Sequence, residues 1–150
     1  MDILGRILGE EAVRVAGEIK TSSRARLRGA QRVVTCPGQR ASTGVNPARD
    51  LSIQFEDGPA VNIRLSLLKV GNLAFAGVSG EVLTNIGARL KKESPFTTTI
   101  MVTHCNGSSG YLPDDAAYQQ VSYEITTSRV KPGCAENAIV NGLLEMMDQY

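Results

Sequence analysis

The segment LAFAGVSGEVLTNIGARL (73–90) gives the clearest indication of the fold of this chain. It begins within an almost continuous apolar run, 72–79, which is typical of a strand buried on both faces of a sheet. Apolar residues then recur at helical spacing, with Val82, Ile86 and Leu90 on one side. A buried strand that leads directly into an amphipathic helix predicts an α/β fold, with helices covering a sheet.

The segments before this stretch add a helix and further strands. Apolar residues recur at helical spacing over 2–20, which predicts an amphipathic helix. Residues 31–37 predict a short strand that ends at its proline. Residues 51–55 and 60–70 both alternate apolar and polar side chains, and the Glu-Asp-Gly-Pro turn at 56–59 predicts that they form a hairpin.

The segments after it continue the mixed pattern. Residues 97–105 are rich in β-branched side chains and predict a second buried strand. We expect a further strand at 121–128 and a terminal helix at 132–150. The predicted architecture over 1–150 is a mixed β-sheet covered by helices, in a single domain or a portion of a larger one.

Composition excludes some classes of partner. The 16 Lys+Arg residues nearly balance the 15 Asp+Glu residues, so the charge pattern of a nucleic-acid-binding protein is absent. The basic run 20–32 fits a solvated helix end and loop, or a contact with an anion or membrane surface. No apolar run approaches the ~20 residues that cross a bilayer. The N-terminal residues lack the features of a signal peptide, and the compartment is not predicted.

The cysteines and the single histidine give weak chemical signals. Cys36, Cys105 and Cys134 are an odd and sparse set, which predicts neither a disulfide framework nor a zinc site of the C-x-x-C type. His104 and Cys105 are adjacent, and neighbours on a strand point to opposite faces. They therefore do not form a nucleophile–base pair with each other, and we expect both to be structural.

Glu81 has two interpretations. It follows a buried strand at the predicted start of a helix, where Ser79 is a plausible N-cap and a carboxylate is stabilised by free N–H groups. Ligands also gather where strands end in α/β layers, and a carboxylate there makes a good metal ligand. A Ser hydrolase is not predicted, because the sequence 77–82 lacks the last glycine of a G-x-S-x-G motif.

Three of the four tyrosines lie in NGSSGYLPDDAAYQQVSYE (106–124). Tyr111, Tyr118 and Tyr123 could each be packing residues. A phenol beside a divalent cation can also ionise well below its free pKa of ~10 and act as a ligand or an oxyanion donor. Their spacing does not decide between these interpretations.

The segments 73–92 and 100–124 together resemble the neutral/alkaline ceramidase family. In that family a buried strand ends in Pro-Gly-Glu before a helix, a second strand ends in Asn with a Tyr five residues later, and a Tyr-Glu pair follows twelve residues after that Tyr. The order and internal spacing agree here. The matching residues are Gly80, Glu81, Gly87 to Leu90, Asn106, Tyr111, Tyr118, Tyr123 and Glu124.

The resemblance implies a zinc-dependent amidase that cleaves the N-acyl bond of ceramide or a similar N-acyl lipid. It implies that Glu81 and Tyr111 are zinc ligands. Tyr123 would lie beside the reacting carbonyl and stabilise its developing negative charge. Tyr118 would keep a structural role. The resemblance does not extend to residues that bind the lipid, and these are not predicted.

The chain also departs from the family pattern. Ser79 replaces the usual proline, and the family's upstream zinc-binding histidines and serine have no counterpart here; His104 matches neither ligand. The sequence therefore resembles the C-terminal part of a larger catalytic domain. Alone, we expect it to bind zinc weakly and to lack amidase activity, because a catalytic zinc has three protein ligands. Apolar surface left by the missing part predicts a homo-oligomer.

Two alternatives stay open. The chain could be a non-catalytic α/β scaffold or oligomerisation domain derived from the same family. It could also be part of a related amidase that acts on a different acyl substrate. An upstream coding segment with a His-x-His element and a serine-bearing loop would favour an enzyme.

Overall fold

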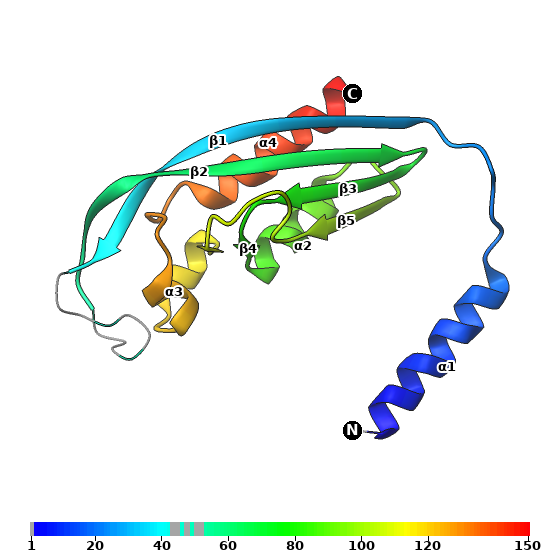
Figure 1. The fold of residues 1–150 in the computed structure, drawn as a ribbon, viewed down its shortest axis with the longest axis horizontal. Coiled ribbons are helices and arrows are strands. Elements are labelled where there is room, and N and C mark those ends of the chain that lie inside the picture. The colour runs from blue at the N-terminus through cyan, green and yellow to red at the C-terminus, as the bar shows by residue number, and fades with distance from the viewer. Residues whose placement is uncertain (1, 43–45, 47–48, 50–52) are drawn as a thin grey trace.

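The computed structural model describes residues 2–42, 46, 49 and 53–150. Among these residues, four strands form a mixed sheet in the order β1-β2-β3-β5, shown in Figure 1. The neighbouring pairs β1–β2 and β2–β3 are antiparallel, whereas β3 and β5 are parallel. Helix α2 connects β3 to β5 along the chain, so the predicted α/β fold is confirmed. These elements are β1 (Leu27–Ala41), β2 (Phe55–Val70), β3 (Leu73–Val78), α2 (Thr84–Glu93) and β5 (Thr98–Val102).

The other elements surround this sheet. A two-stranded parallel sheet pairs β4 with β6 where β3 ends. The part of the chain that the structure describes holds no helix long and apolar enough to cross a membrane. The remaining elements are α1 (Asp2–Glu18), β4 (Glu81–Val82), β6 (Tyr111–Leu112), the 3-10 helix η1 (Asp115–Gln119), α3 (Tyr123–Thr127) and α4 (Ala135–Gln149).

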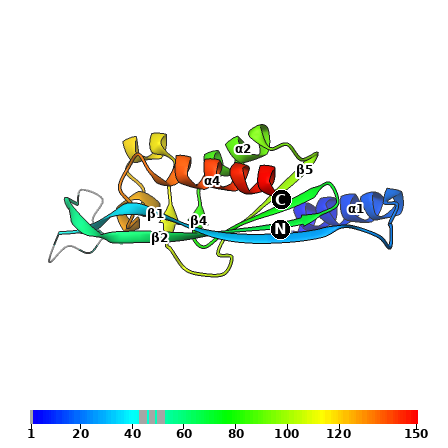
Figure 2. The same ribbon diagram turned by 90° about the horizontal axis from the view of Figure 1, so that it is seen from above.

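The hydrophobic core lies between the sheet and two helices. Figure 2 shows α2 and α4 on the same side of the sheet. Alternate residues of β2 point to this side, and Ile63, Leu65 and Leu67 are buried there against α4. A Cβ atom at Gly142 of α4 would lie 2.6 Å from the Leu65 Cδ1 atom, so glycine lets the helix approach the sheet closely.

In the part of the chain that the structure describes, no helix covers the opposite face of the sheet. Leu68, Ile100 and Val102 are 47%, 39% and 38% exposed there, so the prediction that 97–105 is buried on both faces is wrong. A groove of about 560 Å³ runs along this face and is lined by Leu68 and Val102. Helix α1 is also without a buried residue, and Figure 1 shows it projecting from the sheet.

The predicted hairpin between 51–55 and 60–70 is wrong. Strand β2 runs straight through the predicted turn at 56–59 and pairs along its length with β1; residues 51 and 52 lie outside the described residues. Nor does Pro37 end the first strand, because the pairing continues past a bulge between Cys36 and Gly38. A Cβ atom at Gly38 would lie 1.8 Å from the Pro59 carbonyl oxygen, so the strands can approach this closely only at glycine.

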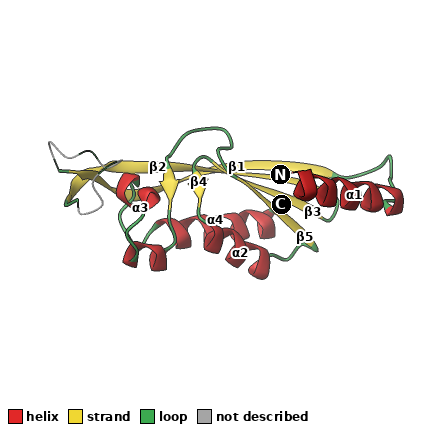
Figure 3. Cartoon of the chain, turned by 90° about the horizontal axis from the view of Figure 1, so that it is seen from below, coloured by secondary structure: helices red, strands yellow, loops and turns green. Residues whose placement is uncertain are grey.

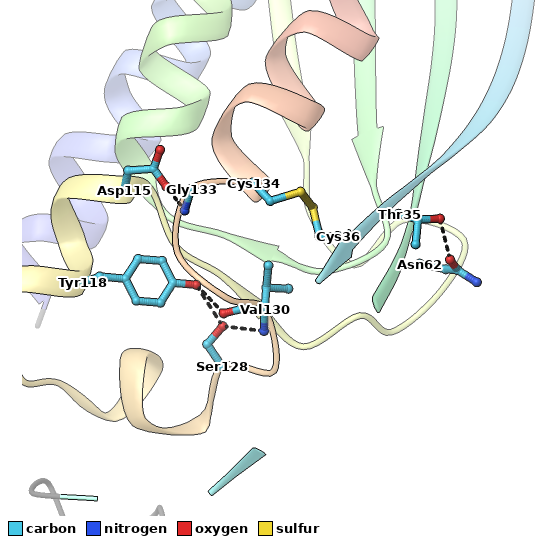
Figure 4. Close-up of a disulfide and its surroundings, with 9 residues drawn as sticks. All are labelled: Thr35, Cys36, Asn62, Asp115, Tyr118, Ser128, Val130, Gly133 and Cys134. Atoms are coloured by element: carbon cyan, nitrogen blue, oxygen red, sulfur yellow. Dashed lines mark hydrogen bonds between the residues drawn. A yellow bond between two sulfur atoms is a disulfide. The ribbon is translucent and has the colours of Figure 1, made fainter. Parts of the chain in front are cut away.

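A disulfide joins Cys36 of β1 to Cys134, which precedes α4 (Figure 4). The sequence did not predict this pair, because the two cysteines are 98 residues apart and an odd cysteine count gives no framework. The bond links the middle of the longest strand pair to the start of the helix that covers it. Cys105 remains a free thiol.

The predicted strand at 121–128 is a short helix, α3. Ser122 has extended backbone angles, and its hydroxyl oxygen accepts a hydrogen bond from the backbone N–H of Ile125 at 3.5 Å. A serine N-cap and Glu124 in the first turn are helix-start signals, and they outweigh the β-branched residues of this segment. Figure 3 shows α3 on the side of the molecule where β3 ends and β4 follows.

Tyr118 holds the segment before α4 in place. Its hydroxyl donates to the Val130 carbonyl oxygen at 2.7 Å, as Figure 4 shows. Burial raises the pKa of Tyr118 above its ordinary value of 10.0. The folded chain holds this proton more tightly than the unfolded chain. The protonated Tyr118 hydroxyl therefore stabilises the fold below pH 10.0, and this stabilisation is lost as pH rises through the raised pKa.

We therefore expect Tyr118→Phe to lower the free energy of unfolding by about 1 kcal/mol at neutral pH. The variant should also lose part of the alkaline destabilisation that the wild type shows above pH 10.0. Urea unfolding at neutral and alkaline pH measures both effects, and the half-exposed Tyr150 gives a control as Tyr150→Phe. An unchanged alkaline loss in Tyr118→Phe would contradict this assignment.

Candidate active site

Glu81 lies in a strand rather than at the start of a helix. It opens β4, and α2 begins only at Thr84, so the prediction that Ser79 caps a helix beginning at Glu81 is wrong. The Ser79 hydroxyl instead accepts a hydrogen bond from the backbone N–H of Arg64 at 2.8 Å and contacts the Ser109 hydroxyl at 2.7 Å. Ser79 therefore links β2 to the loop before β6 and fixes the position from which Glu81 departs.

Strand β6 places Tyr111 beside Glu81. The two residues are partners in the parallel β4–β6 pair, and the Glu81 N–H donates to the Gly110 carbonyl oxygen at 2.9 Å. Partners in register project to the same face of a sheet, so the carboxylate and the phenol are neighbours. Gly110 has φ +79, a conformation that glycine adopts at low cost.

Helix α3 brings Tyr123 to the same place. Its ring packs edge to face on the Tyr111 ring, with 5.8 Å between the centroids and 83° between the planes. Tyr123 is 48% exposed, so this side of the cluster is open to solvent. The structure thus brings together Glu81, Tyr111 and Tyr123, which come from three separate segments of the chain.

The site carries negative charge. The pKa of Tyr111 is raised, first by burial and then by electrostatic interaction with Glu81, Tyr123 and Glu124. Hydrogen bonding from Ser122 lowers the pKa of Glu124 and keeps that carboxylate ionised. Two carboxylates therefore act on one phenol, which stays protonated in this environment. Such a site attracts cations.

His104 also reaches the site, which sequence reasoning missed. It follows β5, its backbone N–H donates to the Gly80 carbonyl oxygen at 3.1 Å, and its Nε2 atom lies 3.3 Å from the Glu81 Oε2 atom. Because β3 and β5 are parallel, the residues that follow them meet at one edge of the sheet. This rule could have identified His104 as a site residue. It was not applied, because His104 was predicted to lie within the strand rather than after its end.

Cys105 points elsewhere. Its sulfur accepts a hydrogen bond from the Asn106 Nδ2 atom at 3.4 Å, and a Cβ atom at Gly77 would lie 2.6 Å from it. The thiol therefore lies over the uncovered sheet face, and the prediction that His104 and Cys105 do not act as a pair agrees with this arrangement.

The side chains present fit a zinc ion in their chemistry. Carboxylate, imidazole and phenol oxygen or nitrogen atoms are all ligands that zinc accepts. Among the described residues, the Glu81 carboxylate pairs with His104 and with no lysine or arginine, so no fixed cation competes for it. Those residues hold no group of three or more His, Cys, Asp or Glu side chains suited to a metal, so a site here needs the Tyr111 phenol.

Comparison with known proteins gives a distant structural likeness. Neither a protein-family model nor a curated protein matches the chain. A solved structure of a ceramidase complexed with C2 is similar over 59% of this chain, with a TM-score of 0.50 and 13% sequence identity. The match spans 15% of that ceramidase chain, and an identity this low shows the fold alone. This chain therefore has a fold similar to part of a ceramidase.

Proposed function

We propose that this chain is a portion of the catalytic domain of a zinc-dependent amidase that hydrolyses an N-acyl amide such as ceramide. One observation carries the proposal. Glu81, Tyr111 and Tyr123 were singled out by their motif positions alone, and they converge on one accessible site from β4, β6 and α3. The ceramidase-like fold supports the same assignment.

Each residue has a distinct task in this proposal. Glu81 and Tyr111 hold the zinc ion, and β-sheet pairing keeps their backbones in register. Tyr123 packs against the Tyr111 ring, so the residue lies beside the ligands without being one of them. From there it can donate a hydrogen bond to an amide oxygen as negative charge develops on it.

A bound zinc ion would supply Lewis acidity, by polarising the amide carbonyl or lowering the pKa of a water molecule. The open site exposes almost half of the Tyr123 and Glu81 side chains, so these residues alone do not exclude water from a substrate. The rest of the domain would enclose the amide and supply further catalytic groups. The isolated chain is therefore expected to be inactive.

The test is zinc binding by the chain and its variants. We expect Glu81→Ala and Tyr111→Phe each to weaken zinc binding by at least about 10-fold, because each removes a ligand atom. Tyr123→Phe is the matched control: it removes a hydroxyl from the same cluster but no proposed ligand, so its zinc affinity should equal that of the wild type. Isothermal titration of metal-free protein measures all four.

Equal zinc affinity of the wild type and Glu81→Ala would refute the metal assignment. Clear hydrolysis of a fluorogenic N-acyl substrate by the isolated chain would refute the view that essential groups lie outside it. These two results bear on different parts of the proposal, so each can fail alone.

A second candidate function is a non-catalytic scaffold that acts by self-association. The exposed apolar side chains on the uncovered sheet face and on α1 favour it, because such surfaces mark interaction sites. Light scattering that shows a stable monomer at high concentration would argue against this scaffold. A dimer whose formation is unaffected by Glu81→Ala, together with absent zinc binding, would favour it over the amidase.

A further inference from the structure

We propose that His104 is a third protein ligand to the same zinc ion, beside Glu81 and Tyr111. The inference rests on the proposed zinc site and extends it. From the sequence we expect two zinc ligands in this chain and a structural role for His104. The structure instead places the imidazole on the carboxylate that is the first candidate ligand.

The separation of the two side chains supports a shared ion. The His104 Nε2 and Glu81 Oε2 atoms are 3.3 Å apart. Nitrogen and carboxylate ligands at about 2.1 Å from one tetrahedral zinc lie about 3.4 Å apart. An ordinary N–H···O hydrogen bond is shorter, at about 2.9–3.0 Å. The pair forms a long hydrogen bond here, and its spacing also matches that of two ligands of one ion.

The backbone holds His104 in this position. Its φ is 52°, in the left-handed region that few residues other than glycine adopt. Two hydrogen bonds fix the turn, from the His104 N–H to the Gly80 carbonyl oxygen and from the Cys105 N–H to the Val78 carbonyl oxygen at 2.9 Å. Gly80 and Val78 lie one and three residues before Glu81, at the junction of β3 and β4. The same backbone segment therefore positions both the turn at His104 and the Glu81 carboxylate.

The ligand count then becomes that of a catalytic zinc. Three protein ligands with an open fourth position is the usual arrangement. The β4–β6 pairing places Tyr111 next to Glu81, and the hydrogen-bonded turn places His104 next to the same residue. Both side chains therefore lie near one carboxylate. A chain with this set should bind zinc by itself, more tightly than two ligands would allow.

Cys105 provides the sharpest control. A thiolate is a better zinc ligand than an imidazole of the same exposure, and Cys105 is adjacent to His104 in the sequence. Its sulfur is held by Asn106 over the uncovered sheet face, and the inference requires that it stay outside the site. Cys105→Ser should therefore leave zinc affinity unchanged.

The experiment uses the single histidine of the chain. In untagged, metal-free protein the imidazole nitrogen resonances belong to His104 without ambiguity, and zinc is added to one equivalent at neutral pH. We expect the Nε2 resonance to move to that of a metal-bound nitrogen as zinc binds. His104→Gln should weaken zinc binding by about 100-fold or more, since loss of a residue that merely supports a ligand costs 10–100-fold.

The outcomes separate this inference from the proposed function. If zinc binding depends on Glu81 and Tyr111 while the imidazole resonances do not move, the inference is overturned and the zinc amidase proposal stands. A wild-type chain that binds no zinc also overturns it, because three ligands in place should hold the ion. Cys105→Ser that weakens binding as much as His104→Gln overturns it too. Zinc affinity unchanged in both Glu81→Ala and Tyr111→Phe refutes the proposed function, and the inference then fails with it because it rests on the same site.

Discussion

Replacing Cys36 and Cys134 together with alanine is expected to lower the free energy of unfolding by about 4–5 kcal/mol. The disulfide closes a loop of 98 residues, which contains β2, β3, α2, β5 and the candidate site. Opening a loop of that length restores a large conformational entropy to the unfolded chain. Cys36 is also fully buried, so the substituted side chains leave a small cavity in the core.

Urea unfolding of the wild type, of the double alanine variant and of the reduced wild type measures this effect. Cys105→Ala is the matched control, because it removes a cysteine that forms no disulfide, and it should change the free energy of unfolding by less than about 1 kcal/mol. Oxidised and reduced wild type that unfold at the same urea concentration would contradict the structural role of the bond.

The second large effect is expected at Gly80, the residue before Glu81. A Cβ atom there would lie 2.5 Å from the Gly110 carbonyl oxygen and 2.6 Å from the Leu112 Cδ1 atom. The oxygen cannot move away without breaking its hydrogen bond from the Glu81 N–H. Gly80→Ala should therefore destabilise the fold by about 1–3 kcal/mol and separate β6 from β4, which weakens zinc binding as well.

Gly87→Ala gives the matched control for this substitution. Gly87 lies in helix α2, where an added Cβ atom would be 3.9 Å from Met101, an ordinary contact. The helix propensity of alanine should make that variant about 0.5–1 kcal/mol more stable with unchanged zinc affinity. Thermal unfolding and zinc titration of both variants test the pair. A Gly80→Ala protein as stable as the wild type would contradict the close approach of β4 and β6.

The sequence predicted the parts of the fold whose pattern is local. The apolar run before Ser79 became β3, the helical spacing up to Leu90 became α2, and the terminal apolar stripe became α4. The predictions that were wrong concern segments whose structure depends on pairing with residues distant in the chain. Gly58 and Pro59 read as a turn by composition, but their place opposite Gly38 in a bulged strand pair makes them strand residues.

Burial was misjudged for a related reason. A continuous apolar strand usually has cover on both faces, and β5 does not, because α2 and α4 lie on one side. The disulfide could not be found either, since its cysteines meet only when α4 packs over β1. The exposed face of β5 and the disulfide both depend on tertiary packing, which cannot be predicted from a short stretch of sequence.

The candidate site shows the same division. Motif positions selected Glu81, Tyr111 and Tyr123, and the structure brings these three together. Glu81 reaches the site as a strand residue, however, and the helix that carries Tyr123 was predicted as a strand. His104 was passed over because its left-handed turn, which directs the imidazole toward Glu81, has no signature in the residues around it.

Anomalous X-ray diffraction at the zinc edge, on crystals of the chain grown with zinc, tests whether Glu81 and Tyr111 hold a zinc ion. We expect one strong anomalous peak within bonding distance, about 2.0–2.2 Å, of a Glu81 carboxylate oxygen and the Tyr111 phenol oxygen. The peak should be absent from crystals of Glu81→Ala grown in the same way. A peak that persists in that variant, or zinc bound only at residues away from Glu81 and Tyr111, would contradict the proposed zinc site.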